Sequence, residues 1–228
     1  MKTYSLTTFN THKSPINGES ELTWDEIVDL FTQGHRPAKD KNELLCFNGA
    51  RFKTLDEVID EDRDGYVTPP WDSLSYVRRK KQNLKTVELL IIDYDGGVEL
   101  DEARSMFKEY RYLGYTSFRH LYDGKTHKFR LIFPLSEPIP ASIKYDSDGR
   151  IVGHDVYHDL IEAIGDFAPG SDPSAYNHGT QLFFIPSAPS ERIHLSQSWH
   201  NEGKILDWSE WKVTDRSSRH PTAALAAS

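Results

Sequence analysis

Four large apolar residues at positions 89–92 run directly into an Asp-Tyr-Asp-Gly-Gly sequence at positions 93–97. A short apolar run that is closed by glycines is typical of a buried central strand. Because successive side chains of a strand point to opposite faces, Asp93 and Asp95 share one face. Adjacent carboxylates repel each other unless a cation lies between them, and Mg²⁺ prefers carboxylate oxygens. The stretch therefore predicts a strand end that either faces water beside a turn or holds a divalent metal.

The composition indicates a folded and somewhat polar protein, with 228 residues, 37% hydrophobic content and 12% aromatic content. This length allows one large domain or two small ones. No apolar run approaches the ~20 residues that a membrane span needs, and the N-terminus lacks the apolar core of a signal peptide. A single cysteine, Cys46, excludes an intrachain disulfide and a cysteine-rich zinc site. We therefore expect a cytoplasmic protein without membrane contact, in the host cytoplasm if the source is a virus.

The formal net charge of −8 argues against a protein that simply coats nucleic acid. Two basic clusters nevertheless stand out. One is the Arg-Arg-Lys-Lys run at 78–81, and the other comprises Arg119, Lys125, Lys128 and Arg130. Each is compatible with a local basic groove or with an ordinary solvated surface.

The pattern from residue 87 onward predicts the order strand, helix, strand, strand, helix, strand. The predicted helices cover 98–110 and 154–164, and the predicted strands after the first cover 112–118, 127–135 and 181–185. This βαββαβ order is the ferredoxin-like split βαβ, also called RRM-like, whose first and third strands are central and paired. We therefore predict an α+β fold with an RRM-like catalytic core over residues 87–190.

The segments on either side of this core predict smaller units. Residues 1–86 are expected to form an N-terminal α/β module packed on the core, with mobile first residues and a helix that starts at a Thr23–Glu26 capping box. Residues 191–228 are expected to form a closing segment and a mobile tail, anchored by tryptophans. Together these parts predict one compact unit.

Several residues that carry charge fall at the ends of the predicted strands. Asp93 and Asp95 end the first strand, His120 ends the second, and Asp172 lies in the loop before the fourth. A split βαβ sheet can bring these positions together on one face. Carboxylates that bind two divalent metals and cations that hold a triphosphate suffice for phosphoryl transfer. By position alone, Asp166 and Asp123 compete with Asp172.

Three stretches, in order, resemble motifs of the archaeo-eukaryotic primase superfamily, in the primase-polymerase forms encoded by phages and plasmids. The first is Ile-Ile-Asp-Tyr-Asp-Gly at 91–96. The second is Tyr-Thr-Ser-Phe-Arg-His at 115–120 with the Lys-Phe-Arg-Leu-Ile-Phe-Pro-Leu strand at 128–135. The third is Asp172 followed by Leu-Phe-Phe-Ile-Pro-Ser at 182–187. The resemblance covers roughly residues 20–190, weakly at the N-terminal end.

The resemblance implies a DNA primase or DNA polymerase, that is, a template-directed nucleotidyltransferase of phage or plasmid replication that uses two Mg²⁺ or Mn²⁺ ions. Its expected partners are nucleoside triphosphates, a single-stranded DNA template and a helicase domain or protein. It implies Asp93, Asp95 and Asp172 as metal ligands and catalytic residues, His120 as a further catalytic residue, and Ser117, Arg119, His127, Lys128 and Arg130 as nucleotide-binding residues.

The chain departs from the family pattern in three ways. Relatives often carry an arginine near Gln181, and His127 competes with His120 for the same role. The sequence also has no Gly-x-x-x-x-Gly-Lys phosphate loop and thus no helicase domain of its own, so we expect either a stand-alone domain or a fragment of a larger replication protein.

Two other functions remain open at the sequence level. A rolling-circle replication initiator endonuclease needs a His-hydrophobic-His metal pair, which is absent, and a helix tyrosine such as Tyr157. A non-catalytic RRM-like module that binds single-stranded nucleic acid needs outward aromatics on its central strands, for which Phe129 and Phe133 are candidates.

Overall fold

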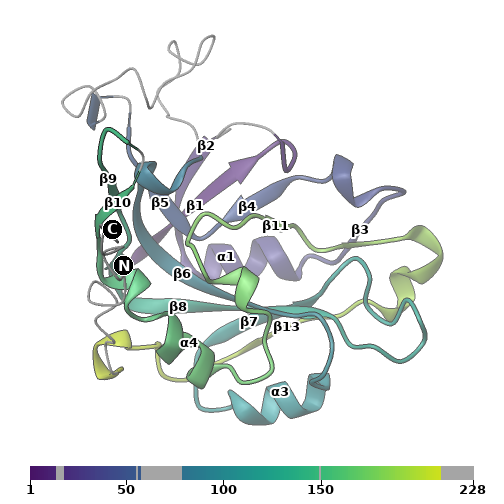
Figure 1. Ribbon diagram of the computed structural model, residues 1–228. Helices are drawn as coiled ribbons and strands as arrows, with labels where there is room; N and C mark the ends of the chain where they lie inside the picture. Colours follow the sequence, from purple (N-terminus) through teal and green to yellow (C-terminus); the bar gives the residue numbers. More distant parts are fainter. Residues whose placement is uncertain (14–17, 55, 58–78, 149, 212–228) are drawn as a thin grey trace, which may run out of the picture.

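The computed structural model describes residues 1–13, 18–54, 56–57, 79–148 and 150–211 (Figure 1). The predicted mobile tail lies outside these residues. Among the described residues, no helix is long and apolar enough to cross a membrane. The fold is mixed α+β, as predicted, and is built on two antiparallel sheets.

The larger sheet has five strands in the order β13-β7-β8-β6-β5. Its members are β5 (Ala50–Phe52), β6 (Leu84–Tyr94), β7 (Tyr112–Thr116), β8 (Phe129–Pro140) and β13 (Ser198–Asn201). Strand β6 contains the apolar run that the sequence placed at the centre, and it pairs with β8 as the split βαβ requires. Helix α3 (Leu100–Met106) connects β6 to β7, so the first four elements of the predicted core are in place.

The fourth strand of the predicted core is wrong. Strand β11 (Phe183–Phe184) does not flank β6; it pairs with β4 (Cys46–Asn48) in the smaller sheet, whose order is β11-β4-β1-β2. The Asn48 amide explains this placement, because it donates to the carbonyls of Gly179 at 2.9 Å and Gln181 at 2.5 Å. Strand β5 takes the vacant edge of β6 instead.

The N-terminal residues were expected to be mobile, and this expectation is wrong. They form β1 (Thr3–Phe9), an inner strand of the smaller sheet, next to β2 (Gly18–Thr23). Tyr4, Leu6 and Phe9 are all at most 3% exposed, so burial of these apolar side chains fixes the strand. Helix α1 (Trp24–Thr32) follows, and its predicted capping box is present, with Thr23 and Glu26 bonded reciprocally.

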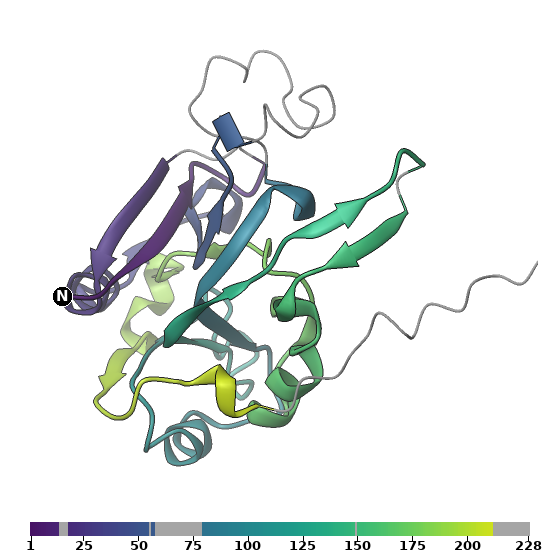
Figure 2. The same ribbon diagram turned by 90° about the vertical axis from the view of Figure 1, so that its left-hand side faces the viewer.

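The predicted helix over 154–164 begins later than expected. Strands β9 (Ile143–Tyr145) and β10 (Ile151–His154) form a hairpin that projects from the body (Figure 2), and α4 (Ile161–Phe167) follows it. Short elements complete the part of the chain that the structure describes. They are β3 (Arg36–Pro37), β12 (Ser187–Ala188) and the 3-10 helices η1 (Lys41–Glu43), η4 (Lys81–Asn83), η5 (Val156–His158), η6 (Pro173–Ala175), η7 (Ser190–Leu195) and η8 (Trp208–Glu210).

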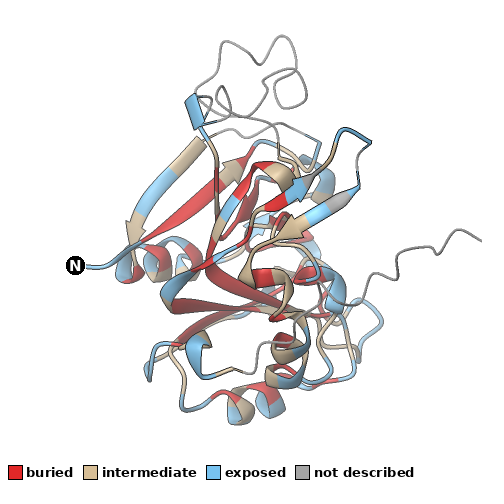
Figure 3. Ribbon diagram, turned by 60° about the vertical axis from the view of Figure 1, so that its left-hand side comes forward, coloured by how far each residue is buried: buried red, intermediate tan, exposed pale blue. Residues whose placement is uncertain are grey.

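Both faces of the five-stranded sheet are covered, and the buried residues concentrate in its central strands (Figure 3). Helices α3 and α4 lie on one face, where the Phe107 and Phe167 rings are 5.2 Å apart. On the other face, Phe31 of α1 lies 5.7 Å from the Tyr115 ring and 4.8 Å from the Phe47 ring of β4. The C-terminal end of β6, at Asp93 and Asp95, borders a hollow that Lys41 and Phe184 also line.

The segment after residue 190 is attached by its tryptophans. Trp199 of β13 lies flat against Gly114, where an added Cβ would be 2.3 Å from its ring. Trp208 donates to the Glu137 carbonyl at 2.9 Å, and the Trp211 ring lies 5.3 Å from the Phe167 ring. The division of the chain into three parts stays a prediction. Strands β5 and β13, which come from the first and the last of these parts, belong to the same sheet as β6.

Candidate active site

The pairing of β6 with β8 places Asp93 directly opposite Arg130. The Arg130 Nε atom lies 3.1 Å from Asp93 Oδ1, and both side chains are largely buried, with 13% and 20% exposed. Burial raises the pKa of Asp93, while Arg130 counters this by favouring the ionised carboxylate. The guanidinium also lies over the Tyr115 and Phe183 rings, so it is fixed in position.

Asp95 has a different environment, although it lies only two residues further along. Its side chain is 62% exposed and accepts a hydrogen bond from Lys128 Nζ at 2.7 Å. Gly96 and Gly97 then turn the chain with φ values of 122° and 82°, which favour glycine. The site thus contains one buried and one exposed acid–cation pair.

Both carboxylates line a cleft with a volume of about 170 Å³. The cleft is lined by Lys41, Asp93, Asp95, Ser117, Phe118, Arg119, Lys128, Arg130 and Phe184. Four cations and two acids therefore face one hollow of a chain whose net charge is −8. Of the predicted nucleotide-binding residues, Ser117, Arg119, Lys128 and Arg130 lie here. Sequence reasoning missed Lys41 and Phe184 as site residues, because only the long-range pairing of β4 with β11 brings them to the cleft.

The loop between β7 and β8 carries much of this wall and is held from several sides. The Ser117 N–H donates to the Lys128 carbonyl at 2.9 Å, which closes the loop. Leu121 within it has a positive φ of 51°, an uncommon conformation for a branched residue. The Arg192 guanidinium of η7 donates to the Leu121 carbonyl and lies over the Tyr122 ring. These contacts fix the positions of Ser117 and Lys128.

His120 lies beneath this loop and does not line the cleft. Only 6% of it is exposed, and burial, followed by the neighbouring His127, lowers its pKa to about 4. Its Nδ1 accepts from the Lys128 N–H at 3.1 Å, and its buried Nε2 has no hydrogen-bond partner among the described residues. His127 is also outside the cleft lining, since its Nδ1 accepts from the Leu100 N–H at 3.0 Å. Contact of either histidine with a nucleotide stays a prediction.

The backbone of Asp172 lies next to that of Asp93. Its N–H donates to the Asp93 carbonyl at 2.8 Å, although its carboxylate accepts from Ser174 Oγ at 2.7 Å and caps η6. The two competitors are elsewhere. Asp166 is exposed on α4, and Asp123 caps its own turn by accepting from Thr126. A metal-binding role for Asp172 stays a prediction, because its carboxylate is engaged by Ser174.

The donor chemistry of the cleft fits a hard divalent cation only in part. Among the described residues, no group of three or more histidine, cysteine or acidic side chains is arranged to hold a metal. Mg²⁺, however, commonly binds through one or two carboxylates and completes its shell with water and substrate phosphates. Asp93 and Asp95 supply those two carboxylates.

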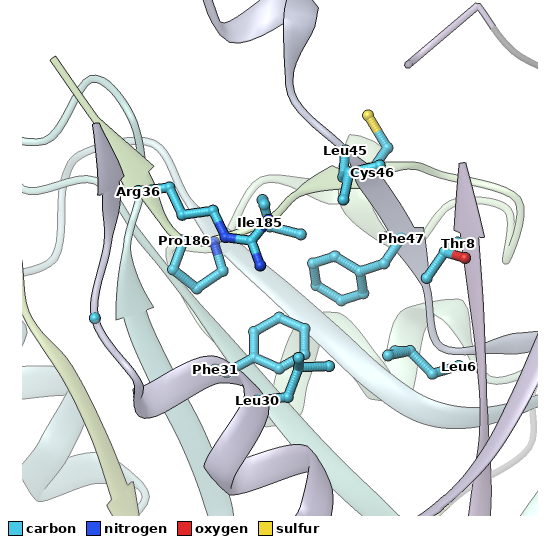
Figure 4. A pocket seen from close by; sticks show the side chains of 11 residues that line it. Leu6, Thr8, Leu30, Phe31, Arg36, Leu45, Cys46, Phe47, Ile185 and Pro186 are labelled. Carbon is cyan, nitrogen blue, oxygen red and sulfur yellow. The ribbon is translucent and has the colours of Figure 1, made fainter. Parts of the chain in front are cut away.

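A second hollow lies beside the cleft, between α1, β1, β4 and the segment that follows β11 (Figure 4). It has a volume of about 120 Å³. Its walls are mostly apolar, with Phe31, Phe47 and Ile185 among them, and Arg36 and Cys46 are its reactive or charged members. No residue of the predicted site lines it.

A scan against protein-family models finds no match, and a search of the curated proteins finds none either. Among solved structures, the chain is similar to the AEP domain of the primase-polymerase (PrimPol) of cyanophage S-2L. The sequence identity is 12% and the TM-score 0.40, over 90% of this chain and 84% of that chain.

Proposed function

We propose that the protein is a primase-polymerase, a template-directed nucleotidyltransferase that extends or starts a DNA strand. The observation that carries this proposal is the cleft itself, in which the carboxylates of Asp93 and Asp95 and four cationic side chains line one hollow. Phosphoryl transfer needs positioning and charge neutralisation more than it needs covalent chemistry from the protein. A nucleoside triphosphate is a substrate class that uses both kinds of charge in one site, because acids hold its metal ion and cations contact its phosphates.

In the proposed reaction, a 3′-hydroxyl oxygen of the growing strand bonds to the α-phosphorus of the nucleotide. The bond from that phosphorus to the bridging oxygen breaks, pyrophosphate leaves, and the hydroxyl proton passes to solvent. A divalent Mg²⁺ or Mn²⁺ ion held by Asp93 and Asp95 would neutralise charge on the phosphates. Ser117, Arg119 and Lys128 would orient the triphosphate, because the loop that carries them is held by Arg192 and by the hydrogen bond from the Ser117 N–H to the Lys128 carbonyl.

The described structure gives less support to the two alternatives. An RRM-like binding module would stack bases on Phe129 and Phe133, but both rings are 0% exposed under α3 and α4. A rolling-circle endonuclease would use a tyrosine nucleophile, but Tyr157 is 2% exposed and its hydroxyl donates to the Tyr176 carbonyl. The single-stranded template and the helicase partner belong to the proposal.

The test is incorporation of labelled deoxynucleotides and ribonucleotides on primed and unprimed single-stranded DNA, with Mg²⁺ or Mn²⁺. Asp93→Asn and Asp95→Asn should each reduce incorporation by about three orders of magnitude or more, because each removes a charge that the transition state needs. Asp166→Asn is the matched control, since Asp166 is an exposed acid on α4, away from the cleft. It should retain full activity.

The same assay separates the proposal from its rivals. Strand binding without incorporation under any metal condition would favour the binding module. Cleavage of the template with a covalent protein–DNA product would favour the endonuclease. Activity that survives in both Asp93→Asn and Asp95→Asn would contradict the site assignment.

A further inference from the structure

The cations of the cleft are not equally available to a substrate. Arg130 is paired with the buried carboxylate of Asp93, and Lys128 is paired with Asp95. Among the ion pairs of the described residues, none includes Lys41 or Arg119, although both side chains line the cleft. Two of the four cations are therefore neutralised by acids of the protein itself.

In the metal-free protein, recruiting Arg130 to a phosphate would leave Asp93 buried without a counter-ion. Such a step is strongly unfavourable, because an unpaired buried charge loses its solvation and gains nothing in return. Lys128 is easier to release, since its partner Asp95 is mostly exposed and such pairs are weak. Lys41 and Arg119 need no release at all. An incoming polyanion should therefore meet these two side chains first.

Lys41 is the better placed of the two, because its backbone is anchored and its side chain is supported. It begins η1, where the Asp40 carboxylate accepts from the Asn42 N–H at 2.9 Å and the Leu44 N–H donates to the Lys41 carbonyl at 3.1 Å. Its Nζ atom lies 5.6 Å from the centre of the Phe184 ring, across the paired strands β4 and β11. Arg119, by contrast, is exposed within the loop.

We propose that Lys41 is the primary phosphate-binding residue of the cleft, holding the polyphosphate of the nucleotide with Arg119 as its second contact. Arg130 then remains paired with Asp93 and does not contact the phosphates. This inference rests on the proposed function for the identity of the substrate, but it concerns a residue outside all three motifs. It also makes the N-terminal part of the chain a direct contributor to substrate binding.

The experiment is titration calorimetry of the full chain with inorganic tripolyphosphate, with and without Mg²⁺. Lys41→Gln should raise the dissociation constant about tenfold or more, as expected for a lost charge-assisted contact. Lys39→Gln is the matched control, because Lys39 is an exposed lysine two residues away that does not line the cleft. It should change the dissociation constant by less than about twofold.

Phe184→Leu tests the support of the lysine while leaving all charges in place, and should weaken binding by about two- to fivefold. An unchanged dissociation constant in Lys41→Gln, or no binding of tripolyphosphate by the unsubstituted protein, would overturn the inference. Failure of the proposed function looks different. In that case tripolyphosphate binds through Lys41 and no nucleotide is incorporated.

Discussion

The cleft and the apolar pocket are lined by consecutive residues of one segment and differ in almost everything else. Phe184 faces the cleft, while Ile185 and Pro186, the next residues, line the apolar pocket. Their volumes are comparable, at about 170 and 120 Å³. Yet the cleft gathers four cations and two acids, whereas Arg36 is the single charged residue of the pocket lining.

The difference shows that the shape of a cavity says little about its chemistry. The apolar pocket is the kind of hollow that arises where a helix and two sheets meet imperfectly, and its walls contribute stability through burial. The cleft wall instead contains charges that depend on one another. Substitutions in the cleft and in the apolar pocket should therefore change different properties of the protein.

The largest effect should come from Arg130→Met, which removes the counter-ion of a buried carboxylate. Breaking a buried ion pair from one side typically costs about 3–5 kcal/mol. We expect a loss of this size in the free energy of unfolding, measured by urea denaturation at pH 7. The control is Lys128→Met, which breaks the exposed pair with Asp95 and should cost less than about 1 kcal/mol. Equal losses of unfolding free energy in the two variants would contradict the view that Asp93 depends on its counter-ion more than Asp95 does.

A second effect concerns Cys46, which borders the apolar pocket but points its sulfur away from the Phe31 and Phe47 rings (Figure 4). Burial raises the pKa of its thiol to about 11, so little reactive thiolate exists near neutral pH. Alkylation by iodoacetamide at pH 8 should be about a hundredfold slower than for the same chain unfolded in urea, where the pKa returns to ~8.5. Mass spectrometry can follow the reaction at this single cysteine. Equal rates in the folded and unfolded chains would mean that the fold does not shield the Cys46 thiol.

The smallest effect should be seen in the contribution of His120 to the pH dependence of the free energy of unfolding. Its folded pKa of about 4 lies below the ~6.5 of an unfolded histidine, so the unfolded chain binds more protons between these values. Stability from this group is therefore complete above pH ~6.5 and falls as the pH drops toward 4, by on the order of 2 kcal/mol.

The measurement is urea unfolding at several pH values for the unsubstituted protein and for His120→Gln. Other buried histidines, such as His35 and His158, have lowered pKa values and contribute to the slope in both proteins. The difference between the two slopes isolates His120. Parallel pH profiles would show that His120 is not held neutral beneath the loop.

Local patterns in the sequence predicted those elements that depend on residues close together in the chain. The apolar run of β6, the alternation of β8 and the capping box of α1 all depend on neighbours close in the chain, and all are found in the structure. The cross-strand pairing of Asp93 with Arg130 follows from the same register, although the sequence assigned that arginine to a nucleotide.

What the sequence could not predict depends on distant pairing. The edge beside β6 was assigned to β11, but hydrogen bonds from the Asn48 amide hold residues 179–181 on the smaller sheet. The same pairing brings Lys41 and Phe184 together. A polar N-terminus concealed β1, because its alternate polar residues face Glu88 and other partners within the protein. None of these contacts leaves a periodic signal.

The edge strands of the larger sheet have a consequence for how the protein is made. Strand β5 ends at Phe52 and β13 ends at Asn201, so the sheet takes its two borders from nearly opposite ends of the described chain. During synthesis, one edge of β7 stays unpaired until residue 201 has left the ribosome. Until then, Gly114 also lacks the Trp199 indole that covers it. Such late, long-range closure slows folding and exposes strand edges to aggregation. Nascent chains that stall or end before β13 are therefore expected to depend on chaperones.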